Sequence, residues 1–499
     1  MKKILKYAVL GMLSICSVAC SFINVDPISE IPEDNMWKNQ RDVNAGIAEI
    51  YASFRTALRS NYFSWGEMRS DNFVLYQELP SEFRNLILNQ MTTDLVCTNW
   101  ASLYKVISNT NFAIRNIPNA DITDLALKDD YLAQAYAMRG LCYFYAVRVW
   151  GAVPVYLEPI DNIANAVIKG RTPKNDVLRD VIIPDLEMAE SLINPANVER
   201  KRISRAAIYC ILADAQMWLG DYEAADATLD RFMSAYGSPA APKSNSKYKF
   251  EPDIVKLKNS FVNHLNNVAG DNNPTVDEYG EANEFIFVIH QKISEAGLNN
   301  YSLIWNVLGC GMGQGSTVVL SPKLQAIYEA SIGKDPMDKR LEYYLCGSKS
   351  SMETYQVHKY MANGSSVNYQ DVINCETAYP LYRFTDVVLM QAEIKAHLDK
   401  WQEALDLVQF ILARAGVASK IAKVSDFSTR DEVIDYILDQ KQIEQVGECK
   451  RWFDLVRNHR VVEVMNPING IDNESQELFP IHQTIIDLGQ GTYEQNIGY

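Results

Sequence analysis

The chain has 499 residues, with 47 lysines and arginines against 62 aspartates and glutamates, which gives a formal net charge of −15. This length is enough for one large domain, or a few smaller ones, with a sizeable core. The acidic charge argues against two classes of protein. These are nucleic-acid binders, which neutralise phosphates with basic side chains, and proteins held at a membrane by a basic amphipathic helix.

The first residues have the pattern of a secretory signal. Three lysines, at positions 2, 3 and 6, precede an apolar run over 7–19, which is shorter than the ~20 residues that cross a bilayer as a helix. Cys20 follows Ala19 and resembles the acylated cysteine of the bacterial lipobox, although Ser17 stands where a leucine is usual. We predict that residues 1–19 are removed and that lipid on Cys20 anchors the mature chain to a membrane. An unmodified Cys20 beside an ordinary cleavage site is the alternative.

The cysteines and histidines give no sign of a metal site. The nine cysteines form no C-x-x-C pair and the six histidines form no H-E-x-x-H motif, so we expect no metal ion. We also expect no cofactor. Cys142 and Cys210 lie in apolar helical patterns and are predicted to be small core residues, whereas a pairing within the set Cys310, Cys346 and Cys375 stays open.

The segment SNYFSWGEMRSDNF, residues 60–73, combines aromatic with charged and amide side chains. Aromatic rings that stack on a sugar, flanked by groups that bind its hydroxyls, are typical of a carbohydrate site. This segment predicts four carbohydrate-binding candidates: Trp65, Arg69, Asp71 and Asn72. The alternative is a structural role where a helix meets a loop.

Two later segments repeat one pattern. ILADAQMWLGDYEAADATLDRFM (211–233) and MQAEIKAHLDKWQEALDLVQFIL (390–412) align without gaps, so that Tyr222 falls on Trp401. Each predicts a helix, a tight turn and a second helix that opens with an aromatic residue, as in tetratricopeptide-type repeats. Residues 135–155 predict a further first helix, which Gly151 and Pro154 end. Residues 100–117 are predicted to pair with it.

Between the two matching segments the chain changes character. Residues 237–280 are rich in Gly, Pro, Ser and Asn and predict loops, whereas 284–291 and 316–320 predict strands. Aromatic residues continue through this part, and Tyr301 and Trp305 are candidates for carbohydrate contacts. The run GCGMGQGS (309–316) lacks the G-K-[ST] of a phosphate loop and predicts a structural loop. We therefore expect a helical scaffold over about 40–236 and 380–460, with an irregular binding insertion over about 237–379.

The segment EQVGECKRWFDLVRNHR, residues 444–460, places opposite charges three and four residues apart. On one helix such charges face each other, so the segment predicts a structural ion network rather than a catalytic one. G-x-S-x-G is absent and no carboxylate pair stands out as a general acid and base. We expect no catalytic residues.

The motifs together resemble the SusD/RagB family of outer-membrane lipoproteins from Bacteroidetes. The similarity runs from CSFINVDPISEIPEDNMW near the start to LFPIHQTIIDLGQGTYEQNIGY at the end. Between them come AMRGLCYFYAVRVWGAVPV, RISRAAIYCILADAQMWLGDYEAA, YPLYRFTDVVLMQAE and ECKRWFDLVR. The chain departs from the family pattern at Gln440, Cys449 and Lys450.

The resemblance implies a mainly α fold, in which tetratricopeptide-like helix pairs support an irregular ligand-binding part. It also implies a surface-exposed lipoprotein of the outer membrane, which binds oligosaccharides without catalysis and passes them to a SusC-like TonB-dependent transporter. Family members often place ligand contacts near Trp100 and the RSDN stretch, which adds Trp100 to the candidates. Core packing is the alternative for Trp100, because it also begins a helix.

Three other functions stay open on the sequence alone. The ligand could be a peptide, as in RagB-like proteins, and the acidic charge would then favour a basic one. The chain could also be a helical-repeat adaptor that only organises partner proteins. An enzyme that cleaves glycans comes last, because no motif supports it.

Overall fold

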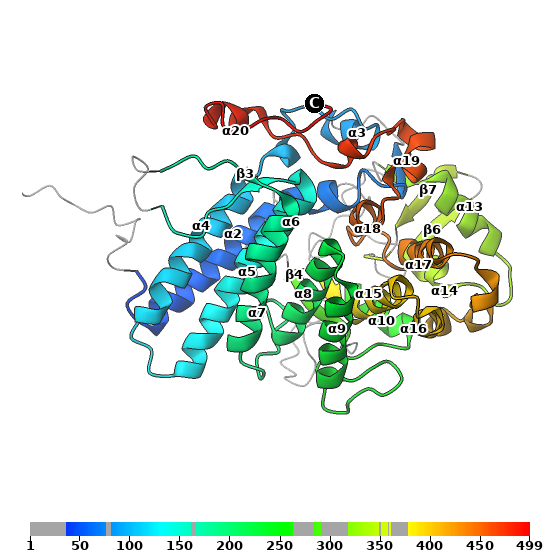
Figure 1. Cartoon of the computed structure of the whole chain (residues 1–499). Helices are drawn as coiled ribbons and strands as arrows, with labels where there is room; N and C mark the ends of the chain where they lie inside the picture. Colours follow the sequence, from blue (N-terminus) through cyan, green and yellow to red (C-terminus); the bar gives the residue numbers. More distant parts are fainter. Residues whose placement is uncertain are drawn as a thin grey trace, which may run out of the picture.

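The computed structural model describes residues 36–75, 81–160, 166–262, 283–290, 318–348, 351–357, 359–360 and 378–499. Cys20, Tyr301, Trp305 and the run 309–316 lie outside these residues. Helices dominate the described part (Figure 1), which confirms the prediction of a mainly α fold.

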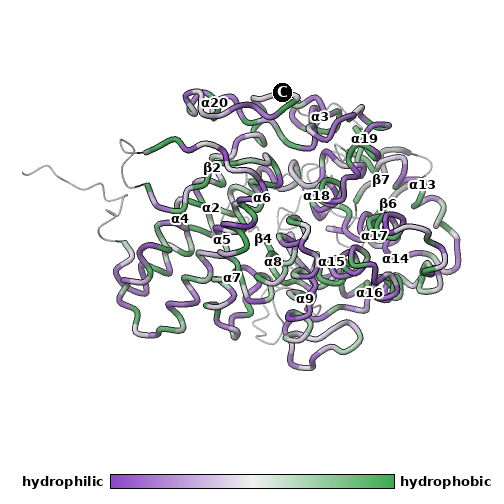
Figure 2. Tube along the Cα trace, in the orientation of Figure 1, coloured by the Kyte–Doolittle hydropathy of each residue, from purple (hydrophilic) through white to green (hydrophobic). Residues whose placement is uncertain are grey.

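Long helices that lie side by side form the N-terminal half (Figure 1). They are α2 (Gln40–Gly66), α4 (Ala101–Asn116), α5 (Leu125–Trp150) and α7 (Ile183–Leu192), with the short elements α3 (Ser81–Ile87), η3 (Val96–Thr98), η4 (Ile117–Asn119), α6 (Lys174–Val177) and the π-helical η6 (Leu178–Ile182). Hydrophilic and hydrophobic residues alternate along the outer helices (Figure 2), as expected when one face of each packs on the core. Helix α4 packs against both α2 and α5, which confirms the predicted pairing of 100–117 with the helix of 135–155.

Helix α5 is the central helix of this half. Most of its residues from Asp130 to Trp150 are buried, because α2, α4, α7 and α8 (Arg205–Leu219) all pack against it. Gly140 lets α7 approach closely, since a Cβ there would lie 3.3 Å from Leu186 Cγ and 3.4 Å from a backbone oxygen. The helix ends at Gly151, whose φ of +73° favours glycine.

The two matching segments fold as the predicted helix pairs. The first pair is α8 and α9 (Tyr222–Tyr236), and the second is α15 (Phe384–His397) and α16 (Trp401–Arg414). The aligned turn residues Gly220 and Asp399 both have positive φ, +83° and +59°. Tyr222 stacks on His397 with a centroid distance of 3.9 Å, so the aromatic that opens α9 joins one pair to the other.

The remaining helices lie mainly in the C-terminal half, and Figure 1 shows the C-terminus between α20 and α3. They are α10 (Ile254–Val262), α13 (Pro322–Ser331), α14 (Lys339–Tyr344), α17 (Arg430–Glu444), α18 (Arg451–Arg457), α19 (Val461–Asn469) and α20 (Gln483–Leu488), with the 3-10 turns η9 (Ala418–Lys420), η10 (Val424–Asp426) and η11 (Glu474–Glu477).

The strands described form four two-stranded antiparallel sheets. The pairs are β1 (Phe73–Leu75) with β5 (Val318–Leu320), β2 (Val153–Pro154) with β3 (Arg171–Thr172), β4 (Phe285–His290) with β8 (Ala378–Arg383), and β6 (Leu345–Ser348) with β7 (Ser351–Val357). Strands β4 and β5 confirm the two predicted strands. Strand β8 leads directly into α15 and was not anticipated.

A buried ion network joins segments that are far apart in the sequence. Arg383 donates to Glu284 at 2.7 Å, to Glu444 at 2.9 Å and to Glu448 at 2.8 Å. All four side chains are 0% exposed. Such a cluster is stable only because each carboxylate meets a cation at hydrogen-bond distance.

Arg414 and Lys359 complete the network. Arg414 binds Glu284 at 2.9 Å and Glu444 at 2.8 Å, and Lys359 binds Glu448 at 2.5 Å. Burial alone would raise the pKa of Glu448, but the nearby cations hold it at about 2.

The prediction of a structural ion network over 444–460 is confirmed, but the prediction of a single helix is wrong. Gly447 and Cys449 have positive φ, +76° and +60°, and they break the segment between α17 and α18. Apart from the pair Arg457–Asp454, the charges of this segment mostly find partners on other elements. Arg451, for example, binds Asp71 at 2.7 Å.

Four cysteines are buried as free thiols: Cys97, Cys142, Cys210 and Cys449. This confirms Cys142 and Cys210 as core residues. None of the helices in the described ranges has the length and apolar character needed to span a bilayer.

Because Arg383 is at the centre of the buried network, replacing it with an uncharged residue should strongly destabilise the fold. We expect Arg383→Met to lower the free energy of unfolding by about 3–5 kcal/mol, because it leaves buried carboxylates short of a cation. The matched control is Arg179→Met, at an exposed pair with Asp176, for which we expect a change within about 0.5 kcal/mol. Denaturant unfolding measures both, and equal midpoints for the two variants would contradict the role of the network.

Glu67 gives the fold a pH dependence. Its Oε1 accepts from Asn72 Nδ2 at 2.6 Å and from the Gly447 amide at 2.9 Å, while Oε2 has no partner. Burial raises the pKa of Glu67 from 4.5 to about 7. Because the folded chain holds this proton more tightly than the unfolded chain, the stabilisation is complete below pH 4.5 and is lost as the pH rises through 7.

We therefore expect Glu67→Gln to remove part of this pH dependence. The wild-type melting temperature should fall more steeply between pH 5 and pH 8 than that of the variant, whose amide cannot ionise. Glu49→Gln, at a half-exposed carboxylate, is the control and should follow the wild type. Parallel curves for wild type and Glu67→Gln would contradict the assignment.

Candidate functional site

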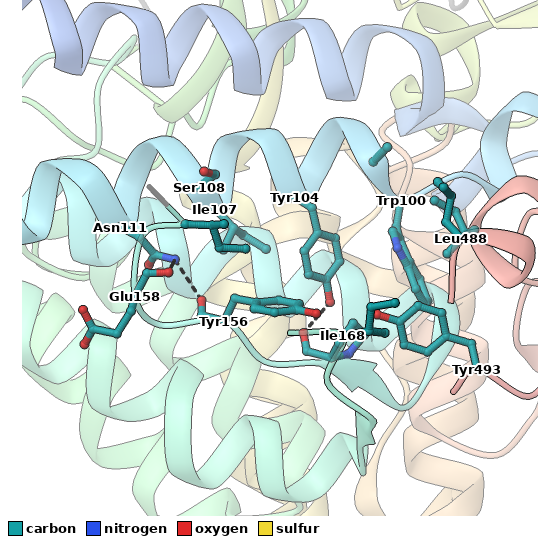
Figure 3. A pocket seen from close by; sticks show the side chains of 14 residues that line it. Trp100, Tyr104, Ile107, Ser108, Asn111, Tyr156, Glu158, Ile168, Leu488 and Tyr493 are labelled. Carbon is teal, nitrogen blue, oxygen red and sulfur yellow. Dashed lines mark hydrogen bonds between the residues drawn. The ribbon is translucent and has the colours of Figure 1, made fainter. Parts of the chain in front are cut away.

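A groove on the outer face of α4 is the candidate site (Figure 3). It has a cavity volume of about 370 Å³, within the range of small-molecule sites. The side chains that line it come from three parts of the chain: Trp100, Ala101, Tyr104, Ile107, Ser108, Asn111, Pro154, Tyr156, Glu158, Ile160, Ile168, Ile485, Leu488 and Tyr493.

Helix α4 forms the floor of the groove. Positions 100, 104, 107, 108 and 111 share one face of a helix, because they follow its three- and four-residue spacing. Eleven residues of helix rise about 16 Å, so the floor is elongated. Trp100 lies at one end of the row and Asn111 at the other, as Figure 3 shows.

The opposite wall is the connection between β2 and β3, which supplies Tyr156 and Ile168, and the C-terminal segment, which supplies Leu488 and Tyr493. The rings of this wall stand nearly perpendicular to the rings of α4 that they contact. Tyr104 and Tyr156 are 6.3 Å apart at 83°, and Trp100 and Tyr493 are 5.6 Å apart at 85°. Edge-to-face packing of this kind stabilises the aromatic lining itself.

Several polar groups of the groove are bound within the protein. Tyr104 donates its hydroxyl to the Pro154 carbonyl at 2.6 Å, and burial raises its pKa well above the ordinary value, so it stays neutral. Asn111 donates to the Tyr156 carbonyl at 2.9 Å. Glu158 is exposed and is the one charged side chain among the lining residues that the structure describes.

Four predicted candidates lie in the core instead of at this groove. Trp65 is 0% exposed and donates Nε1 to the Cys97 carbonyl at 2.8 Å. Arg69, also 0% exposed, lies 4.2 Å from the centroid of the Trp452 ring. Their burial leaves no ring face or guanidinium edge for a sugar, so the assignment of this segment to a carbohydrate site does not fit the structure.

Asp71 and Asn72 are occupied in the same way. Asp71 is 2% exposed and binds Arg451 through two hydrogen bonds, of 2.7 and 3.0 Å. Asn72 is 1% exposed, donates to Glu67 at 2.6 Å and accepts from Gln442 at 2.9 Å. The structural alternative for residues 60–73 is the one that these contacts support.

Trp100 is the predicted candidate that the structure places in the groove, although only 4% of it is exposed. Tyr301, Trp305 and Cys20 lie outside the described residues. Within the described ranges, no three His, Cys, Asp or Glu side chains come close enough together to hold a metal ion.

Tyr104, Tyr156 and Tyr493 line the groove but were not predicted from the sequence. The signal for Tyr104 was present, because it follows Trp100 by one helical turn in WASLYKV. Tyr493 lies in the C-terminal motif, more than 300 positions after both Tyr104 and Tyr156 in the sequence. Nothing local to the sequence indicates that this motif folds back beside α4.

Comparison with known families matches two parts of the chain. Residues 339–495 match the profile described as "SusD family", and residues 21–216 match the profile described as "Starch-binding associating with outer membrane".

Curated relatives match the chain over nearly its whole length. The SusD-like protein P38 of Formosa agariphila is 27% identical over 98% of this chain and 97% of its own length. The SusD-like protein P2 of the same organism is 23% identical over 92% of each chain.

Solved structures share the fold. A laminarin-binding SusD-like protein superposes with a TM-score of 0.73 at 18% identity, over 93% of this chain and all of its own. NanU of B. fragilis gives a TM-score of 0.72 at 20% identity, over 95% of this chain and all of its own.

The two matching profiles, the full-length relatives and the shared fold thus all point to the same family. The chain belongs to the SusD-like family, and the description of one of its two matching profiles connects the family with starch binding and the outer membrane.

Proposed function

We propose that this protein binds oligosaccharides at the α4 groove and passes them, without catalysis, to a SusC-like TonB-dependent transporter. The observation that carries the proposal is the lining of the groove by Trp100, Tyr104, Tyr156 and Tyr493. Aromatic rings present flat apolar faces on which the apolar face of a sugar packs. The Ser108 hydroxyl and the Glu158 carboxylate add groups that can bind sugar hydroxyls.

The size of the groove limits the ligand. A cavity of about 370 Å³ along an elongated floor suits a short oligosaccharide, or one end of a longer chain, better than a folded polymer. The partly exposed rings of Tyr156 and Tyr493 are the surfaces that we expect such a ligand to contact.

The location is part of the proposal. Acylation of Cys20 would hold the mature chain to the outer membrane with its helical body at the cell surface, where it can meet both the ligand and the transporter. Two signals usually make lipid anchoring stable, and the several chains of an acylated N-terminal cysteine meet that requirement.

A peptide is the second candidate ligand. Four isoleucines and a leucine line the groove, at positions 107, 160, 168, 485 and 488, and the charged residue among its described lining, Glu158, is acidic. An apolar peptide with a basic group would match this surface. Titrations with a protein digest and with glycans under the same conditions separate the two candidates.

We expect Tyr156→Ala to raise the Kd for a bound oligosaccharide about tenfold or more, because it removes an aromatic contact face. Calorimetric titration with laminarin oligosaccharides, followed by malto-, xylo- and manno-oligosaccharides, measures this effect. Tyr343→Ala, at a partly exposed tyrosine of α14 outside the groove, is the control and should bind as the wild type does. If the wild type binds none of the oligosaccharides in the panel, the proposal is wrong.

The anchor is tested in the native bacterium. We expect Cys20→Ala to abolish incorporation of labelled fatty acid and to move the protein from the outer-membrane fraction to the soluble fraction. Cys16→Ala is the control, because Cys16 lies within the predicted leader, and it should leave labelling unchanged. Labelled protein from the Cys20→Ala strain would show that the anchor lies elsewhere.

A further inference from the structure

A buried chain of polar side chains, Asp185–Arg139–Asn111, ends at Asn111 on the floor of the groove. Arg139 of α5 binds Asp185 of α7 through two hydrogen bonds, from Nε and Nη2, each of 2.7 Å. Its Nη1 donates to Asn111 Oδ1 at 3.0 Å. The side chains of Arg139 and Asp185 are each 8% exposed, and neither lines the groove.

This chain ends on the backbone that carries Tyr156 and Glu158. Asn111 Nδ2 donates to the Tyr156 carbonyl at 2.9 Å and to the Glu158 carbonyl at 3.4 Å, and Arg139 Nη1 donates to the Leu157 carbonyl at 3.2 Å. Three consecutive carbonyl oxygens are thus bound by two side chains of α4 and α5. In a regular β-sheet, the neighbouring strand would bind such carbonyl groups instead.

Tyr143 of α5 adds a further pair of bonds to the same residue. Its hydroxyl donates to the Tyr156 carbonyl at 2.9 Å and accepts from the Tyr156 amide at 2.7 Å. The sheet itself contributes little here, because β2 and β3 pair over two residues each. The backbone of Tyr156 therefore depends on side chains of the helices behind it, whereas its ring hydroxyl donates to the Val167 carbonyl at 3.2 Å and accepts from the Lys169 amide at 3.0 Å.

The forked pair with Asp185 fixes the direction of Arg139. A guanidinium held by a carboxylate on one edge presents its remaining N–H groups in one plane and in fixed directions. Here those groups meet Asn111 Oδ1 and the Leu157 carbonyl. Asn111 then has its amide nitrogen turned toward Tyr156, since its oxygen is occupied by Arg139.

We propose that Asp185 and Arg139 are positioning residues of the groove, which set the Tyr156 ring and the Glu158 carboxylate against α4 without touching the ligand. The inference rests on the proposed function, because it takes the groove as the binding site. A wall held in place before binding does not have to be ordered by the ligand, so it increases affinity.

A double-mutant cycle tests the proposal. We expect Asp185→Asn to raise the Kd for the best ligand of the oligosaccharide panel about tenfold, within the usual range of coupling between residues of one hydrogen-bond network, with unchanged stoichiometry. In a Tyr156→Ala background the same change should have little further effect, because the ring that it positions is gone. An equal loss in both backgrounds would overturn the proposal.

A matched control separates positioning from general stability. Asp338, the N-cap of α14, forms a comparable buried fork with Arg340, of 3.0 and 2.7 Å, and α14 lies across the molecule from α4 in Figure 1. Asp338→Asn should lower the melting temperature and leave the Kd unchanged. If Asp185→Asn does not fold, Arg139→Lys replaces it, because lysine keeps the charge beside Asp185 but cannot reach Asn111 and Leu157 together.

A measurement without ligand separates this inference from the proposed function. Hydrogen exchange over residues 154–160 should be faster in Asp185→Asn than in the wild type, and unchanged in Asp338→Asn. If the wild type binds no oligosaccharide but exchange accelerates, the proposed function fails while the positioning role stands. If exchange in this segment is unaffected, the positioning role is wrong whatever the wild type binds.

Discussion

Charge neutralisation around Arg383 is the constraint on which the rest of the fold depends. An ionised carboxylate is costly in a protein interior unless a cation binds it, and here Glu284, Glu444 and Glu448 meet at one guanidinium. Glu284 lies 99 positions from Arg383 in the sequence and Glu448 lies 65 away. Each of these segments carries a charge that can be buried only with its partners. Strands β4 and β8 and the break between α17 and α18 therefore form one unit. The second helix pair starts directly after Arg383 and takes its position from this unit.

Long-range polar contacts also build the groove. Arg69 donates to the Glu477 carbonyl at 2.9 Å, and Arg171 donates to the Glu494 carbonyl at 2.9 Å. Together they hold the C-terminal segment that brings Leu488 and Tyr493 to α4. Arg69 therefore affects the groove from the core, by fixing one of its walls, and not as a sugar ligand. Arg139 acts in the same way on the neighbouring part of this wall, where it holds the backbone that carries Tyr156.

The helices were predictable and most of the groove was not, for a physical reason. Helix pairs follow local periodicity, so the alignment of Tyr222 with Trp401 was enough to place them. Trp65 and Arg69 have the composition of a sugar site, but the same composition packs a core when partners arrive from elsewhere. The partner carbonyl of Arg69 is 408 positions away in the sequence, and local sequence does not encode that distance. Tyr104 could have been found from its spacing to Trp100, whereas Tyr156 and Tyr493 depend on how distant segments fold back.

The positions of the polar groups affect how such a groove would bind and release a ligand. The Tyr104 hydroxyl and the Asn111 amide are bound to backbone carbonyls, so they shape the walls instead of contacting a sugar. Ring faces, the Ser108 hydroxyl and the Glu158 carboxylate are what the described part of the groove offers. Stacking on ring faces accepts many ligands and contributes about 1 kcal/mol for each contact. A rigid wall offsets this weakness because it lowers the ordering cost of binding. Under the proposed function, a ligand held by few directional bonds dissociates readily, which is what a protein that passes its ligand to a transporter requires.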